Sequence, residues 1–354
     1  QNWSEKMAEF PAWGSGGEKM QFLVRYAVLA PSKCNAQPWL FEICGDSMDL
    51  ICDRSWAFHE IDPNCRQLIL SCGAALLNLT IAARHFGCGL QVEPFPWPGD
   101  RYLLARVRLA SSDLGNRAGA AQDASGVFRT NPPDSDELFA ALSRRCTSRR
   151  RFQRRIPPDE TLQALESAVN PYGAWMHLIR DEPQRKQIAQ LVEAGDREQM
   201  ANKPLRKELA RWVHQPFGDS KDGFPVSRYG LPRPMLWLAP GLSLALRALD
   251  LGNVVGRRDR RLAQSAPLLA VLGTDQDTPL SWLAAGQALE SLWLRAAACR
   301  LSLSVFSPPI EVPRVREELA RITGRAGFPQ ALIRLGYGAS ARQSPRRPAE
   351  EVII

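Results

Sequence analysis

The sequence contains few histidines and no clustered cysteines. Its 354 residues include 4 histidines, each isolated in the chain, so a histidine-centred metal site or catalytic triad has little support. The 8 cysteines are scattered, without a CxxC pair and without a histidine at the spacing of metal ligands. We therefore interpret them as reduced thiols and expect a cytoplasmic protein.

The sequence also lacks a long hydrophobic run. Its most apolar segment, residues 235–249, is interrupted by Pro240 and Arg247 and is shorter than the roughly 20 residues that cross a bilayer. The first ten residues carry charges and have no apolar core of the kind found in signal peptides. We expect no transmembrane helix and no membrane partner.

The overall composition is that of a globular protein with an excess of positive charge. Hydrophobic residues make up 45% and charged residues 23% of the chain, which is enough for a sizeable core. The formal charge of +8 favours anionic partners. Charge alone does not choose among nucleic acid, an acidic membrane and a phosphorylated cofactor.

An internal repeat indicates that the chain consists of two similar halves. Residues 73–96 align without gaps on residues 286–309, and the shared identities include Gly73 with Gly286. Apolar residues lie nearly all round both segments, which predicts a buried central helix in each. Strand-like runs precede and follow each helix, so each half is expected to be a small α+β unit.

The repeat also suggests the domain boundaries. We expect a first half at residues 1–110 and a second half at residues 138–354, joined by a linker at 111–137 that is rich in Gly, Ser, Ala and Asp. The second half has an insert at about 182–264 without a counterpart in the first. This insert is interpreted as a lid over a site, the alternative being an extra structural helical hairpin.

One polar loop occurs in the first half only. The stretch LAPSKCNAQPW, residues 29–39, matches residues 167–179, where a proline and a tryptophan remain but the Ser, Lys, Asn and Gln do not. Whatever these polar residues bind is therefore expected to be bound once per chain.

A cluster of arginines follows the linker. Residues 144–155 hold seven arginines in twelve positions. This run is compatible with nucleic-acid binding, with a solvated helix face, or with a pocket for one phosphomonoester built from Arg and Thr donors. Nucleic-acid binding is disfavoured because Phe152 is the sole aromatic residue within the run. Arg346 and Arg347, on a proline-stiffened tail, favour the phosphate pocket because the tail can return to it.

These motifs, in this order, resemble the FMN-binding nitroreductase superfamily. The polar loop, RRCTSRRRF, SPPIEVP (307–313), LIRLGYG and the SPRRP tail carry the resemblance. The runs DPNCRQLILSCGAALLNL, AGQALESLWL and PQALIRLGYG are similar to the Acg-type branch, in which one chain contains two nitroreductase-like halves. The resemblance implies an α+β nitroreductase-like fold, internally duplicated as a pseudo-dimer within one chain. A monomer or weak homodimer is expected.

The resemblance also implies which residues contact FMN. The arginine cluster and the tail would hold the phosphate, the polar loop would meet the ring and ribityl chain, and a backbone N–H of the PPIE segment would face flavin N5. Lys33 stands where the family usually has serine, and Cys146 where it usually has a basic or polar residue. The implied contacts are Arg145, Thr147, Arg149, Arg346 and Arg347 at the phosphate, Pro31, Ser32, Lys33, Asn35 and Gln37 at the ring, and Ile310 and Glu311 at N5.

The function implied by the resemblance is that of an FMN-dependent oxidoreductase. Hydride would pass through flavin N5 between NAD(P)H and a nitroaromatic or quinone-like acceptor, or in a specialised dehydrogenation. No side chain is expected to act as a catalyst, and one FMN is expected per chain. The alternative is a non-catalytic protein that sequesters flavin beneath the insert.

Overall fold

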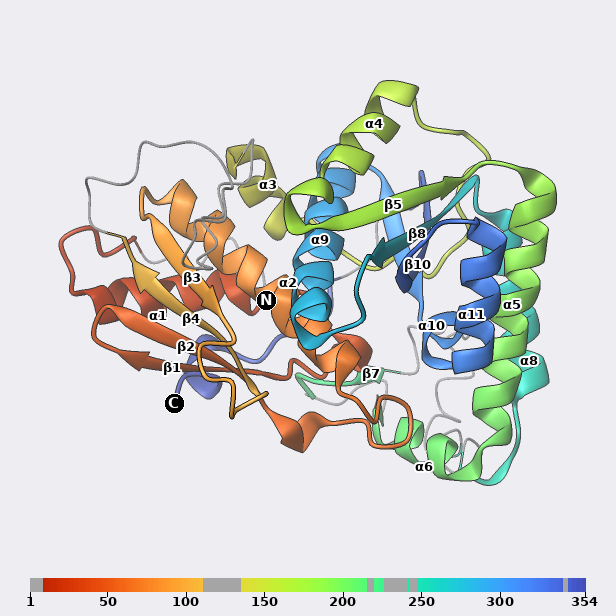
Figure 1. The fold of residues 1–354 in the computed structure, drawn as a ribbon, viewed down its shortest axis with the longest axis horizontal. Helices are drawn as coiled ribbons and strands as arrows, with labels where there is room; N and C mark the ends of the chain where they lie inside the picture. The colour runs from red at the N-terminus through yellow and green to blue at the C-terminus, as the bar shows by residue number, and fades with distance from the viewer. Residues whose placement is uncertain (1–8, 111–134, 215–219, 226–240, 242–246, 340–342) are drawn as a thin grey trace.

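Two antiparallel four-stranded sheets with the same strand order form the framework of the protein (Figure 1). The order is β1-β2-β4-β3 in the first half and β5-β8-β10-β9 in the second. The computed structural model describes residues 9–110, 135–214, 220–225, 241, 247–339 and 343–354. The strands of the two sheets are β1 (Trp39–Cys44), β2 (Ser47–Cys52), β3 (Leu90–Pro94), β4 (Leu103–Leu109), β5 (Ala174–Ile179), β8 (Leu268–Thr274), β9 (Ser302–Phe306) and β10 (Phe328–Gly336).

One long buried helix lies at the centre of each half. These helices are α2 (Arg66–His85) and α9 (Pro279–Ala298), and they pack against each other between the two sheets (Figure 1). Each repeated segment also contains the strand that follows its helix, β3 or β9. The remaining helices are α1 (Gly16–Ala27), α3 (Ser135–Leu142), α4 (Asp159–Ser167), α5 (Glu182–Ala201), α6 (Lys203–Arg211), α8 (Gly252–Ser265), α10 (Pro308–Glu311) and α11 (Pro313–Thr323).

The central helices touch at the glycines that the repeat aligns. A Cβ atom added to Gly73 would lie 2.1 Å from the Leu283 carbonyl oxygen, and one added to Gly286 would lie 2.0 Å from the Leu70 carbonyl oxygen. The two contacts exchange equivalent positions of the repeat, as expected on a pseudo-twofold axis. The prediction of an α+β, internally duplicated fold is confirmed.

Helix α2 satisfies a length and composition test for membrane spans. Its 18-residue window has a mean hydropathy of 1.4, but 89% of that window is buried inside the protein. Among the described residues it is the single helix of this kind. Burial between two sheets explains its apolar character without a membrane.

The insert lies in the chain between β5, an edge strand of the second sheet, and its neighbour β8, and it reaches both halves. Strands β1 and β2 are joined by a turn at Gly45 and Asp46, whereas α5, α6 and α8 lie between β5 and β8. Helices α5 and α8 pack on the second half, while Trp212, just after α6, stacks on Phe58 of the first half at a ring distance of 4.6 Å. The short strands β6 (Val213–His214) and β7 (Phe224–Pro225) also belong to the insert. Most of the expected linker, residues 111–134, lies outside the described residues, and residues 135–137 open α3.

The C-terminal tail returns from the second half to the first sheet. Phe41 of β1 donates its N–H to the Val352 carbonyl at 2.8 Å and accepts from the Ile354 N–H at 3.0 Å. This pairing carries Arg346 and Arg347 past the polar loop.

Candidate functional site

The polar loop has an unusual backbone. Cys34, Asn35 and Gln37 have φ angles of 51°, 59° and 53°, in the left-handed region that non-glycine residues rarely occupy. Ser32 stabilises the turn, because its Oγ accepts a hydrogen bond from the Gln37 N–H at 2.9 Å. Strained backbone of this kind persists where surrounding contacts enforce it, and it is frequent at ligand sites.

The tail of the second half supplies part of those contacts. Arg346 Nη1 donates to Asn35 Oδ1 at 2.9 Å, and Arg346 Nη2 donates to the Leu29 carbonyl at 3.2 Å. The Arg347 N–H donates to Gln37 Oε1 at 2.7 Å. The structure therefore brings together the expected loop and tail residues, which lie more than three hundred positions apart.

A buried ion pair joins the loop to the PPIE segment. Lys33 Nζ donates to Glu311 Oε1, and the two side chains are 12% and 1% exposed. Burial alone would lower the pKa of Lys33, but the Glu311 carboxylate, with Cys34 and Asp62, raises the pKa above its ordinary value. Gln199 of the insert donates to Glu311 Oε2 at 2.8 Å. Glu311 thus contacts the first half and the insert with its two oxygens.

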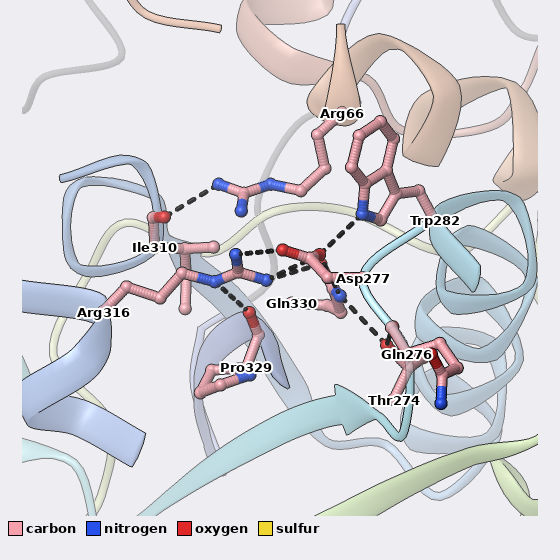
Figure 2. A network of polar contacts seen from close by, with 9 residues as sticks. All are labelled: Arg66, Thr274, Gln276, Asp277, Trp282, Ile310, Arg316, Pro329 and Gln330. Atoms are coloured by element: carbon pink, nitrogen blue, oxygen red, sulfur yellow. Dashed lines mark hydrogen bonds and ion pairs between the residues drawn. The ribbon is translucent and has the colours of Figure 1, made fainter. Parts of the chain in front are cut away.

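A polar network fixes the position of α10 and its neighbour α11 (Figure 2). Arg66, at the start of α2, donates to the Ile310 carbonyl at 2.8 Å. Arg316 of α11 binds both oxygens of Asp277, at 2.6 and 3.0 Å, and donates to the Pro329 carbonyl at 2.7 Å. The network ties the PPIE segment to the first half and to the second sheet.

Asp277 is the centre of that network (Figure 2). Gln330 Nε2 and Trp282 Nε1 also donate to its Oδ1, at 3.0 and 2.7 Å. Burial raises the pKa of this carboxyl, but the hydrogen bonds from Arg316, Gln330 and Trp282 exceed that effect and hold it well below its usual range. Asp277 is therefore ionised at neutral pH.

Arg145 of the arginine cluster lies in the interior, at the junction of the halves. It is 4% exposed, its Nε is 3.3 Å from Glu290 Oε1, and its Nη2 donates to the Leu29 carbonyl at 3.3 Å. Arg346 donates to the same carbonyl. Two arginines from distant parts of the second half therefore meet at the first residue of the polar loop.

The carboxyl group of Glu290 is fully buried beside these arginines. Burial raises its pKa to about 7, although Arg145, Arg346 and Asn78 act in the opposite direction. In the orientation that gives both the nitrogen and the oxygen of its side-chain amide a partner, Asn78 donates to Glu290 Oε1 at 3.2 Å and accepts from the Ala30 N–H at 3.1 Å. Glu290 was not predicted from the sequence as a site residue. The one feature that could have identified it is the presence of a carboxylate within an apolar helix.

Thr147 and Ser148 lie beside β9, and Arg334 holds the backbone of this part of the cluster. Thr147 pairs with Leu303 of β9, and both Thr147 and Arg149 are half-buried. Arg334 of β10, 1% exposed, donates to the Ser148 carbonyl at 2.6 Å and to the Arg150 carbonyl at 2.8 Å. An arginine inside an apolar strand was the signal that could have identified Arg334.

Two buried donors of the arginine cluster fit a phosphorylated cofactor. Arg145 Nη1 and Ser148 Oγ are buried and have no hydrogen-bond partner within the described part of the chain. Unpaired buried donors are uncommon, and an anion would satisfy them by charge-assisted hydrogen bonds. Pro31 and Ser32 are half-buried in the same loop. No group of three or more possible metal ligands occurs among the described residues.

Comparisons with known proteins find relatives that span most of the chain. No family model matches the chain. The chain is 28% identical over 346 residues to the Mycobacterium tuberculosis protein named "Putative NAD(P)H nitroreductase Rv3131", covering 95% of this chain and 91% of that protein. It is 26% identical over 340 residues to "Putative NAD(P)H nitroreductase acg" of the same organism, covering 93% of both.

A solved structure that resembles part of the chain is the FMN-dependent nitroreductase NfnB from Mycobacterium smegmatis in complex with NADPH. It is 15% identical, with a TM-score of 0.40, and the match covers 61% of this chain and 96% of NfnB. The relatives matched over nearly the whole length of the chain confirm the resemblance expected from the motifs: the chain is homologous to Acg-type proteins named as NAD(P)H nitroreductases.

Proposed function

We propose that the chain binds one FMN at the junction of its halves and acts as an oxidoreductase of nitroreductase type. The observation that carries this proposal is the meeting of the polar loop, the tail arginines and the PPIE segment at one place. Lys33 contacts Glu311, and Asn35 contacts Arg346. The names of the full-length relatives support the same reaction class.

Each residue is given the role that the resemblance to nitroreductases implies. Arg145, Thr147 and Arg149, with Arg346 or Arg347, would hold the phosphate as charge-assisted donors. Bound FMN would supply hydride exchange between NAD(P)H and a nitroaromatic or quinone-like acceptor. The residues expected at the ring are Pro31, Ser32, Lys33, Asn35 and Gln37, with the backbone of Ile310 and Glu311 near N5.

The chain itself contributes positioning. Arg66 holds the Ile310 carbonyl, so the backbone of the PPIE segment keeps a fixed orientation toward the junction. Lys33 and Gln199 together hold the Glu311 carboxylate. Such prior positioning of donors is what allows a protein to assist cofactor chemistry without a side-chain catalyst.

A second candidate function is flavin binding without turnover. The insert contacts the polar loop directly, since the Lys221 carbonyl accepts from Asn35 Nδ2 at 3.1 Å and from Gln37 Nε2 at 2.7 Å. An insert held in this position would limit access of a substrate to the ring. This contact is the observation that favours a sequestering role.

Anaerobic mixing of the flavin-loaded protein with NADPH and with NADH separates the two candidates. An oxidoreductase bleaches the 450 nm flavin band rapidly, faster than free FMN under the same conditions. Persistence of the band with both nucleotides contradicts the reductase and supports sequestration.

The location of the site is tested by a matched pair of variants. Asn35→Ala is expected to weaken FMN binding or alter the flavin spectrum, because it removes the contact to Arg346. Asn170→Ala, in the second-half segment that corresponds to the loop and exposed to solvent, is expected to change neither. Equal effects of the two substitutions would argue against the site.

A further inference from the structure

Helix α5 of the insert carries a buried carboxyl group, one oxygen of which has no hydrogen-bond partner among the described residues. Asp196 is 4% exposed, and its Oδ2 has no hydrogen-bond partner within the described ranges. Buried carboxylates in folded proteins are nearly always hydrogen-bonded or paired with a cation. An unpaired one is a candidate functional group.

Asp196 faces the PPIE segment. Its neighbour Gly195 lies against Pro308, where an added Cβ would come within 3.0 Å of the Pro308 backbone. Gln199, three residues further along α5, donates to Glu311 at 2.8 Å. Residues three apart share one face of a helix, so Asp196 lies on the face that meets α10.

A second carboxyl group, Asp259 on the packed helix α8, acts electrostatically on Asp196. Asp259 is 22% exposed, and Arg258 Nη1 is 3.7 Å from its Oδ1. The other charged groups that act on Asp196 are Lys33, Glu311 and Arg258. Burial first, and then the neighbouring Asp259, raise the pKa of Asp196 to about 8, against the effects of Lys33 and Arg258. Asp196 therefore keeps its proton at neutral pH.

We propose that Asp196 donates a proton to the electron acceptor, and that Asp259 passes a replacement proton to it from solvent. This proposal rests on the proposed function. Reduction of a quinone-like acceptor to the hydroquinone takes one hydride, which carries both electrons, and one proton. The Asp196 O–H bond breaks as an O–H bond forms on the acceptor oxygen. The ionised carboxylate of Asp259 then takes a proton from solvent and passes it to the Asp196 carboxylate, so that Asp196 is again protonated and Asp259 again ionised.

The first test measures protonation of Asp196 without any cofactor. A carboxyl whose pKa rises from its ordinary 3.8 to about 8 on folding makes the protein less stable as pH increases from about 4 to 8, because the unfolded chain releases its proton first. Asp196→Asn removes this contribution, so the variant gains stability relative to the wild type as pH increases. Glu198→Gln, on the exposed side of α5, is the control. Parallel pH profiles of wild type and Asp196→Asn contradict the proposal.

The second test follows the two half-reactions by stopped flow. The flavin is reduced anaerobically, chemically or with NADPH, and its reoxidation by a benzoquinone is recorded from pH 5 to 9. The wild-type rate should fall above about pH 8, and Asp196→Asn should be slower by about 100-fold and independent of pH in this range. If the flavin of Asp196→Asn is reoxidised at the wild-type rate, the proposed role of Asp196 is overturned, while the proposed function of the protein stands. Failure of the wild type to bind flavin overturns the proposed function, and the role of Asp196 with it.

Discussion

At the scale of single residues, the junction is built from charged groups removed from solvent. Glu290 is fully buried, Arg145 is 4% exposed, and Glu311 is 1% exposed as a side chain. Each is held by partners from a distant part of the chain. Isolated buried charges would cost several kcal/mol, so these groups are retained only because they are paired.

Glu290 gives a prediction at this scale. Its pKa is about 7 in the folded protein against an ordinary value of 4.5, so the unfolded chain loses the proton first and wild-type stability falls as pH rises from about 4.5 to 7. The free energy of unfolding of Glu290→Gln should be similar to that of the wild type near pH 4. Above pH 5 it should become larger than that of the wild type, by about 3 kcal/mol at most. Urea unfolding at several pH values measures this difference. Parallel curves for the two proteins, with exposed Glu317→Gln as control, would contradict it.

Residue-level contacts were only partly predictable from the sequence. The polar loop could be identified because its polar residues have no counterpart at residues 167–179. Glu290, Arg334 and Arg66 could not be assigned roles, because no local pattern reveals which distant group a side chain meets. Arg145 was expected at a phosphate, and its nearest groups here are Glu290 and the Leu29 carbonyl.

At the scale of elements, one carboxylate anchors α6 of the insert to the first half. Glu208 of α6 accepts from the backbone N–H groups of His59, Glu60 and Ile61, at 2.6, 3.1 and 3.1 Å. Trp212 packs on Phe58 beside it. The insert therefore bridges the two halves near the candidate site.

Replacing Glu208 tests this attachment. In Glu208→Gln, a single uncharged amide oxygen is left to accept from the three N–H groups. The contact should therefore be destabilised by about 1–3 kcal/mol. Hydrogen exchange of the amides at residues 59–61 and in α6 should become faster. Lys207→Gln on the exposed side of α6 is the control. Unchanged exchange at these amides in Glu208→Gln would show that the attachment depends on other contacts.

The elements themselves were largely predictable. Strand-like runs at residues 102–110 and 330–338 correspond to β4 and β10, because alternating or continuous apolar residues mark strands. The attachment of the insert to both halves was not predictable, since it depends on how α6 and Trp212 fit a surface formed by other elements.

At the scale of the whole molecule, the halves meet where two glycines allow close approach of α2 and α9. Both sides of the candidate site are held by this helix pair, since Ser71 of α2 accepts from the Lys33 N–H of the polar loop at 3.3 Å and α9 carries Glu290. The spacing of the central helices therefore also sets the spacing of the site. The repeat predicts that these two glycines are equivalent, but it does not predict that the helices touch at them.

Gly286→Ala tests this dependence. The added methyl group would lie 2.0 Å from the Leu70 carbonyl oxygen, so the helices must separate, with an expected loss of about 3 kcal/mol of stability and weaker FMN binding. Gly17→Ala is the control, because its nearest atom is 3.7 Å away and alanine favours the helix. A Gly286→Ala protein as stable as Gly17→Ala would contradict the close contact.

The central claim is that the two halves together form one FMN site per chain. Titration of the flavin-free protein with FMN, followed by calorimetry and by flavin absorbance after dialysis, counts the sites. One FMN per chain is expected. A stoichiometry of two, or no binding, would contradict it.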